Sequence, residues 1–178
     1  MKKTELSEKT LFLVDFSWLY NKYYFGVLAN NAEKGYDDED LSCKIADYLR
    51  CLLENIRYFF LCKCDIQLIL DPPTSNLVNT KVYEGYKAQR PTELKSKVYK
   101  FFPRVIEILC NSDFYTILRS QEYEADQVIA QLAILNKDLY KKIIIYSGDK
   151  DLIQLTCFKN VDIAEDEDKM SILINKVP

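Results

Sequence analysis

Short apolar runs and longer helical stripes alternate along this chain. Four runs are typical of buried strands, at residues 11–14, 66–70, 114–118 and 142–146. Between the first two, apolar residues recur at intervals of three and four from 41 to 61, which predicts a long amphipathic helix. The acidic residues just before that stripe favour a helix start there, because the N-terminus of a helix attracts negative charge.

The rest of the chain carries weaker patterns, which still predict an ordered succession of elements. They are a partly helical 16–27, an irregular or partly helical 74–90, helices over 92–111 (kinked at Pro103) and 123–136, a turn at 147–149 leading into a short helix, and late strands at 161–164 and 171–174. Strands that alternate with helices predict an α/β fold with a mostly parallel central sheet. Helices should cover both faces of that sheet, giving three layers.

Acidic residues gather where such a sheet would place a site. In parallel sheets, sites form beyond the carboxyl ends of the strands. Six acids can reach that edge: Asp15, Asp71, Asp149 and Asp151 follow predicted strands, and Glu124 and Asp126 open the predicted helix 123–136. Each acid alone could simply be a helix cap or a solvated loop residue. Together, in an order that matches the strand ends, they predict a shared site.

Converging carboxylates repel one another and raise each other's pKa, so they need a cation to be stable together. Oxygen ligands without histidine suit Mg²⁺ or Mn²⁺. Two such ions about 4 Å apart can activate a water and stabilise the leaving oxygen in phosphodiester hydrolysis. The positions of the acids therefore predict a two-ion centre for phosphodiester cleavage.

Composition narrows the chemistry further. The 178 residues, with a net charge of −3, suit one domain with a substantial core. The absence of histidine excludes Ser-His-Asp and Cys-His catalysis, and the four glycines form neither common nucleotide-cradling loop. The six cysteines lack a disulfide-framework spacing and are expected as reduced thiols. No signal peptide or membrane span is visible, so we expect an intracellular, cytoplasmic protein without a membrane partner.

Five segments resemble the 5'-nuclease family, which comprises flap endonucleases and the 5'-3' exonuclease domain of bacterial DNA polymerase I. They are LFLVDFSWLY, LILDPP, YEGYKAQRPTEL with its YKxxRP element, EYEADQVIAQLA with its acidic helix, and IIIYSGDKDLIQL with its SGDxDxxQL motif. The resemblance runs from about residue 11 to 155. It implies a PIN-like nuclease core over residues 1–178, with an arch or gateway at about 74–104 and an acidic segment at about 160–178.

The resemblance also implies roles for individual residues. The six acids would be metal ligands, directly or through water, and Lys87 and Arg90 would contact the scissile phosphate. A wider nucleic-acid surface is expected where basic and aromatic side chains are interleaved. Basic side chains suit phosphates, and aromatic side chains can stack on unpaired nucleobases. It comprises Lys81, Tyr83, Tyr86, Lys87, Arg90, Lys95 and Lys97. For residues 95–104 an ordinary solvated helix is an equal reading, and Trp18 and the tyrosines of 20–24 are expected in packing.

Some positions depart from the family pattern. Phe16 and Pro72 stand where glycine is usual, and Gln127 stands where the bacterial type has a second Asp. The family's helix-hairpin-helix-like C-terminal region, which grips the duplex, is not visible before Pro178. In the family, that region also brings a further Asp or Asp pair to the second metal. The acids of 162–168 could replace these ligands but are expected to be solvated. We therefore expect that a partner chain supplies that region, that the region was removed, or that this chain is a minimal version of the family.

Three functions follow in order of preference. The first is a Mg²⁺- or Mn²⁺-dependent 5' nuclease of replication or repair. It would act on 5' flaps, single-stranded 5' ends or RNA–DNA hybrids, and the compact chain suggests a viral member. The second is a nuclease-like subunit that binds nucleic acid or a partner protein without cutting. The third is a PIN-type ribonuclease, which the YKxxRP element disfavours.

Overall fold

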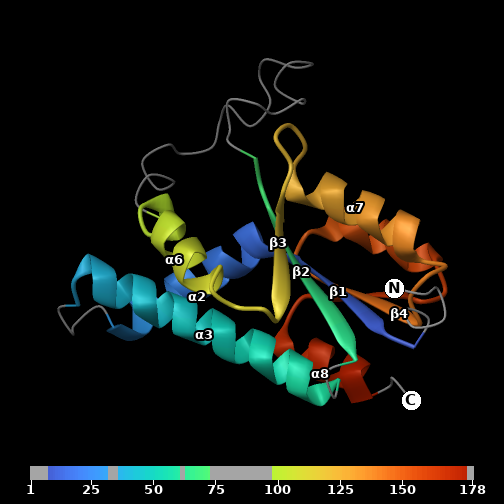
Figure 1. Ribbon diagram of the computed structural model, residues 1–178, viewed down its shortest axis with the longest axis horizontal. Coiled ribbons are helices and arrows are strands. Elements are labelled where there is room, and N and C mark those ends of the chain that lie inside the picture. Colours follow the sequence, from blue (N-terminus) through green and yellow to red (C-terminus); the bar gives the residue numbers. More distant parts are fainter. Residues whose placement is uncertain (1–7, 32–35, 61–62, 73–97, 176–178) are drawn as a thin grey trace.

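A parallel sheet forms the centre of the computed structural model, which describes residues 8–31, 36–60, 63–72 and 98–175 (Figure 1). Its strands are β1 (Thr10–Asp15), β2 (Cys64–Leu70), β3 (Tyr115–Arg119), β4 (Lys142–Tyr146) and β5 (Val161–Ala164). They lie in the order β3-β2-β1-β4-β5, and every neighbouring pair is parallel. β1 is buried along its whole length and has β2 on one side and β4 on the other. The strand order reverses at β1, and its carboxyl end is where a site is expected.

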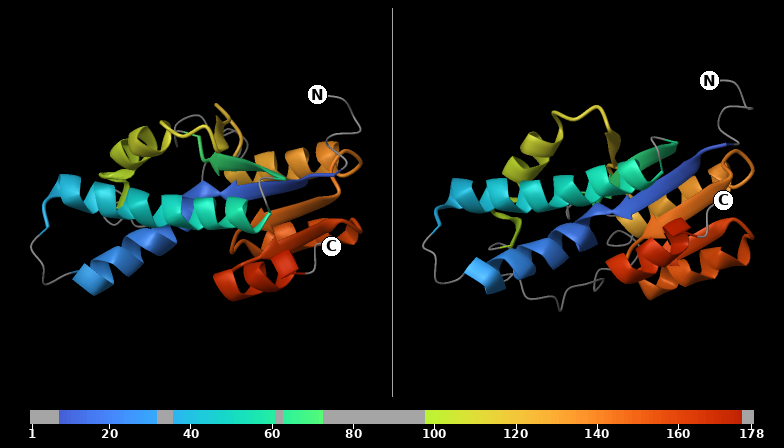
Figure 2. Two further views of the ribbon diagram at one scale, coloured as in Figure 1. Left: turned by 60° about the horizontal axis from the view of Figure 1, so that its bottom comes forward. Right: turned by 90° about the horizontal axis from the view of Figure 1, so that it is seen from below.

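Helices cover both faces, and the alternation of side chains along β1 divides the core between them. Phe12 and Val14 pack with α2 (Phe16–Asn31), α3 (Asp38–Phe59), α6 (Phe102–Leu109) and α8 (Glu167–Asn175). Leu11 and Leu13 pack with α7 (Ala125–Asn136) and the 3₁₀ helix η2 (Lys150–Cys157). In Figure 2, α2 and α3 lie side by side, as their contacts require. The predicted three-layer α/β fold is confirmed.

Most predicted elements are confirmed, with shifts of a few residues at their ends. The long helix begins at Asp38 because the Asp37 carboxylate accepts the Asp40 N–H at 2.9 Å. The acidic run before it therefore starts the helix, as its charge predicted. The five described cysteines, at 43, 51, 64, 110 and 157, are free thiols. In the described residues, none of the helices combines the length and apolar character that crossing a membrane requires.

Two expectations are wrong. Pro103 does not kink a helix; it lies in the first turn of α6, where its missing N–H costs no intrahelical bond. Residues 171–174 are not a strand but part of α8. The Asp166 carboxylate accepts the Lys169 N–H at 2.7 Å and caps that helix, and Met170 and Leu173, three positions apart, face the core. A helix cap and a three-residue spacing outweigh the local β-branched character.

Candidate active site

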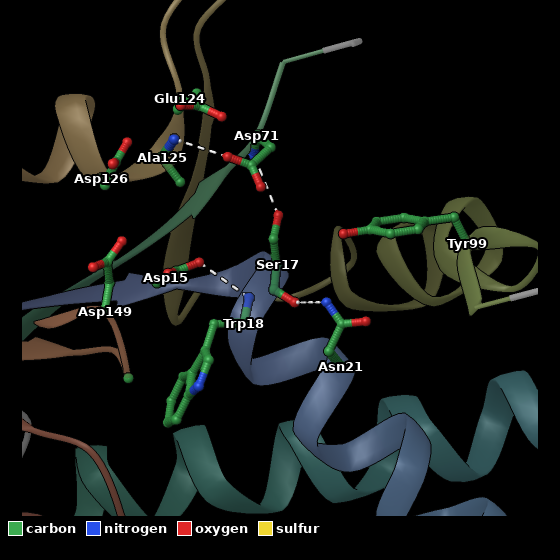
Figure 3. Close-up of a pocket in the computed structure, with 11 residues that line it drawn as sticks. Asp15, Ser17, Trp18, Asn21, Asp71, Tyr99, Glu124, Ala125, Asp126 and Asp149 are labelled. Carbon is green, nitrogen blue, oxygen red and sulfur yellow. Dashed lines mark hydrogen bonds between the residues drawn. The ribbon is translucent and has the colours of Figure 1, made fainter. Parts of the chain in front are cut away.

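The carboxyl ends of β1, β2 and β4 open onto a pocket of about 310 Å³ (Figure 3). Five of the six predicted acids line it: Asp15, Asp71, Glu124, Asp126 and Asp149. Asp151 is exposed and is not among the lining residues. The structure therefore brings together acids from β1, the end of β2, the start of α7 and the loop after β4.

Asp15 is largely buried, with 9% of its surface exposed. Its Oδ1 accepts the Trp18 N–H at 3.1 Å, and its Oδ2 accepts the Ser147 hydroxyl at 3.0 Å. Burial raises the pKa of this carboxyl from 3.8 to about 6; the two hydrogen bonds oppose the rise, and the charges of Asp71 and Asp126 add to it. Ionisation of this carboxyl therefore costs free energy unless positive charge enters the pocket.

Asp71 and the start of α7 are joined directly. The Asp71 Oδ1 accepts the Ala125 N–H at 2.9 Å, and the Asp71 N–H lies 3.4 Å from the Ser17 hydroxyl (Figure 3). Ala125 is the first residue of α7, so this carboxylate satisfies one of the amides that a helix start leaves open. The bond holds the end of β2 against the helix that carries Glu124 and Asp126.

Gln127 stabilises the start of the same helix. Its Oε1 accepts the Glu124 N–H at 3.1 Å, and its own N–H donates to the Asp126 Oδ1 at 2.7 Å. Gln127 is exposed and lies outside the pocket lining. The residue that departs from the bacterial pattern thus holds two acids in place.

Asp149 begins η2 after the turn that follows β4. Its Oδ1 accepts the Asp151 N–H at 2.9 Å, and its own N–H donates to the Ser147 hydroxyl at 3.1 Å. Asp151 contributes its backbone amide here, and its side chain is exposed. The described geometry supports Asp149, and not Asp151, as a pocket residue.

The pocket lining also includes residues that the sequence pattern did not indicate. They are Ser17, Trp18, Asn21, Tyr99 and Gly148. Ser17, Trp18 and Asn21 follow Asp15 within two helical turns, a spacing that could have indicated a shared face. Tyr20 and Tyr24 are buried in the core, as expected, but Trp18 both packs and lines the pocket.

Trp18 and Gly148 fit closely together. A Cβ atom at Gly148 would lie 2.4 Å from the Trp18 Nε1, so no larger residue is accommodated without movement. The indole packs edge-to-face on Tyr146 with ring centroids 5.2 Å apart. Lys22 Nζ lies 5.3 Å from the Trp18 ring centroid and donates to the Tyr146 hydroxyl at 3.4 Å. These contacts hold the indole at the mouth of the pocket.

The predicted nucleic-acid surface, including Lys87 and Arg90, lies outside the described residues. Of the wider basic run, Lys100 pairs with Asp38, and Arg104 pairs with Glu39 at 2.7 Å. These two basic side chains therefore form ion pairs that join α6 and the turn before it to the first turn of α3.

The acids of 162–168 likewise lie outside the pocket lining. Asp162 pairs with Lys142, and Glu165 pairs with Lys169 at 3.6 Å. Glu167 accepts the Tyr23 hydroxyl at 2.8 Å. In the described structure these acids support α8 and the sheet, and they do not extend the site.

The donor set suits a hard cation. Within the described ranges, no three His, Cys, Asp or Glu side chains are grouped tightly enough to hold a metal ion as they stand. The pocket offers carboxylate oxygens from several elements, and Mg²⁺ commonly keeps several waters while binding few carboxylates. The residues present therefore fit a partly hydrated Mg²⁺ or Mn²⁺.

The fold and the site define an α/β protein with a carboxylate pocket at the reversal point of its sheet. Comparison with known proteins gives the family. Residues 10–177 match the family model of the 5'-3' exonuclease N-terminal resolvase-like domain. The chain belongs to this family.

Curated relatives agree with this assignment. The 5'-3' exonuclease of Aquifex aeolicus is 32% identical over 154 residues, which are 83% of this chain and 48% of that protein. The DNA polymerase I of Treponema pallidum is 39% identical over 75 residues, 42% of this chain and 7% of that protein. This chain thus spans about half of the first relative and a small part of the second.

Solved structures agree on the fold. A bacteriophage T5 5'-exonuclease with bound divalent zinc matches with a TM-score of 0.56 at 17% identity, over 87% of this chain and 54% of that one. A T5 D15 flap endonuclease in a pseudo-enzyme-product complex with DNA and metal ions matches with a TM-score of 0.55 at 15% identity, over 87% of this chain and 54% of that one.

The contact between residue 148 and the indole gives a first prediction. We expect Gly148→Ala to displace Trp18 and lower the free energy of unfolding by about 1–3 kcal/mol, because the added methyl overpacks the site. Thermal unfolding and the emission spectrum of Trp18, the chain's one tryptophan, measure both effects. Gly26→Ala is the control: nothing lies within 4 Å there, and helix propensity favours alanine. An unchanged spectrum and midpoint in Gly148→Ala would contradict the packing.

The buried carboxyl of Asp15 gives a second prediction, for metal-free protein in EDTA. Because its pKa is raised from 3.8 to about 6 in the fold, the stability it contributes is complete below pH 4 and is lost as the pH rises through 6. The loss is about 3 kcal/mol at 1.36 kcal/mol per pKa unit. We expect Asp15→Asn to gain that amount relative to wild type between pH 4 and pH 7.5, measured by urea unfolding. A pH-independent difference would refute it.

Proposed function

We propose that this chain is the core of a divalent-metal-dependent 5' nuclease that hydrolyses phosphodiester bonds in DNA or in RNA–DNA hybrids. The observation that carries the proposal is the pocket with five carboxylates at the carboxyl edge of the sheet, in a member of the 5'-3' exonuclease family. Because the chain has no histidine to act as a general base, carboxylate-held ions are the chemistry that the pocket suits.

In this proposal, one or two Mg²⁺ or Mn²⁺ ions are held by the pocket acids Asp15, Asp71, Glu124, Asp126 and Asp149. Asp151, which lies outside the pocket lining, binds the ions directly or through water. Bound ions of this kind activate water and neutralise charge on a phosphate. The carboxylates keep the pocket negative until a cation binds, so they repel a phosphate from a metal-free site. Ionisation of Asp15 and metal binding are therefore coupled.

Lys87 and Arg90 have the complementary role in the proposal. They would pair with the scissile phosphate and stabilise its charge as the bond breaks. The wider surface would bind the nucleic-acid strand that enters the site, by phosphate contacts and base stacking. It comprises Lys81, Tyr83, Tyr86, Lys95 and Lys97. The substrates in this proposal are DNA with 5' flaps, single-stranded 5' ends and RNA–DNA hybrids.

We propose a protein partner as the source of the duplex grip. This chain spans about half of the Aquifex aeolicus relative, so the activity of that whole protein is a proposal for it. A nuclease-like subunit that binds without cutting is the second candidate. Two observations favour it: Asp151 lies outside the pocket lining, and the described acids do not form a tight metal cage.

Cleavage decides between the two candidates. A 5'-labelled flap duplex and a labelled single strand are incubated with Mg²⁺, Mn²⁺ or EDTA. We expect metal-dependent cutting that Asp149→Asn lowers by at least about 100-fold, as loss of a group that stabilises transition-state charge does. Asp138→Asn, at an exposed acid far from the pocket lining, is the control and should cut normally. Binding of DNA with no cutting by the wild type would favour the silent subunit.

The basic segment gives a separate prediction. We expect Lys87→Ala and Arg90→Ala each to slow cleavage by about 10- to 100-fold, because each removes a charge that stabilises the reacting phosphate. Their affinity for Mn²⁺ should stay that of the wild type, since the pocket acids are intact. Lys159→Ala is the control for loss of a base outside the proposed surface. Equal loss in all three variants would show a general charge effect instead.

A further inference from the structure

Ser147 lies between the acids that β1 and β4 bring to the pocket. The register pairs Val14 with Tyr146, so the next residues, Asp15 and Ser147, are neighbours at the end of the sheet. Ser147 is 1% exposed. Its hydroxyl donates to the Asp15 Oδ2 at 3.0 Å and accepts the Asp149 N–H at 3.1 Å. One side chain thus bridges the last residue of β1 and a residue of the turn that follows β4.

The direction of these bonds follows from the donors present. A serine hydroxyl has one hydrogen, and an amide can only donate. The hydrogen of Ser147 therefore goes to Asp15, while the Asp149 amide polarises the hydroxyl and strengthens that donation. The other oxygen of Asp15 is held by the Trp18 N–H. Both carboxylate oxygens are oriented, and each keeps a lone pair for a cation.

The same hydroxyl also holds Asp149. Its backbone amide is tied to Ser147, and its carboxylate begins η2 by accepting the Asp151 N–H. Ser147 itself is held by its own N–H, which donates to the Ala164 carbonyl at 3.1 Å. The backbone of Ser147 is therefore held by a hydrogen bond to the end of β5. Its hydroxyl sets the spacing of two pocket acids.

We propose that Ser147 is a positioning residue for metal binding: its hydroxyl orients Asp15 and fixes Asp149, so that both carboxylates meet one cation. The proposal rests on the proposed function of the pocket and assigns Ser147 no contact with metal or substrate. Groups that orient metal ligands in this way typically contribute about 10- to 100-fold to metal affinity. Removal of the hydroxyl should therefore weaken metal binding more than it weakens the fold.

The test is a Mn²⁺ titration of the full chain without substrate, followed by the fluorescence of Trp18, which lines the pocket. We expect Ser147→Ala to bind Mn²⁺ at least about tenfold more weakly than the wild type. Ser42→Ala is the matched control, because Ser42 is also buried and its hydroxyl donates to a carbonyl within α3, that of Asp38. It should lose comparable stability and bind Mn²⁺ normally. Equal Mn²⁺ affinity in Ser147→Ala and wild type, or equal weakening in both variants, would overturn the proposal.

A second pair keeps the test decisive if the alanine variant does not fold. Ser147→Thr keeps the hydroxyl and adds a methyl group. Ser147→Val has the shape of the threonine variant, with a methyl group in place of the hydroxyl. We expect the threonine variant to bind Mn²⁺ at least about tenfold more tightly than the valine variant. Equal affinity in this pair would overturn the role of the hydroxyl.

Cleavage assays on the same proteins separate this proposal from the proposed function. We expect Ser147→Ala to need about tenfold more Mn²⁺ for half-maximal cleavage and to recover most of the maximal rate at saturation. Wild type that binds Mn²⁺ without cutting would overturn the nuclease and leave the Ser147 comparison intact. Cutting by the wild type, with no difference in Mn²⁺ affinity between variants, would overturn only the role of Ser147.

Discussion

The buried charge of Asp15 is the interaction on which the rest of the site depends. A fully buried strand ends in a carboxylate that is 9% exposed, and burial raises its pKa to about 6. A charge in that position destabilises the metal-free fold, and only hydrogen bonds and a cation offset the cost. The neighbouring groups supply the first of these: Trp18 donates to one oxygen and Ser147 to the other.

Helix starts converge on the acids of the pocket in the same way. Asp15 accepts an amide from the first turn of α2, Asp71 and Asp126 accept amides from the first turn of α7, and Asp149 accepts one from η2. Each bond satisfies an amide that a helix leaves open and places partial positive charge beside a carboxylate. These acids therefore satisfy open helix amides and line the pocket at the same time. Caps hold these carboxylates in fixed orientations, which the proposed cation site requires.

Local pattern and tertiary packing contributed differently to the fold. The strands and the long helix were predictable because burial on both faces demands continuous apolar runs, and burial on one face demands helical spacing. Residues 171–174 misled because a short apolar run suits either a strand or a half-buried helix. The cap at Asp166 and the packing of Met170 and Leu173 on the core decide for the helix. Pro103 misled because the pattern does not show where a helix begins.

The sequence by itself determined the strands, the acids at their ends and the family, because these depend on residue type and local order. Only the tertiary structure decided which acids share the pocket. Asp15 and Ser147 are 132 residues apart and meet because β1 and β4 pair in one register. Trp18 and Gly148 fit each other for the same reason. A register between distant strands depends on the packing of the whole sheet, so no local pattern records it.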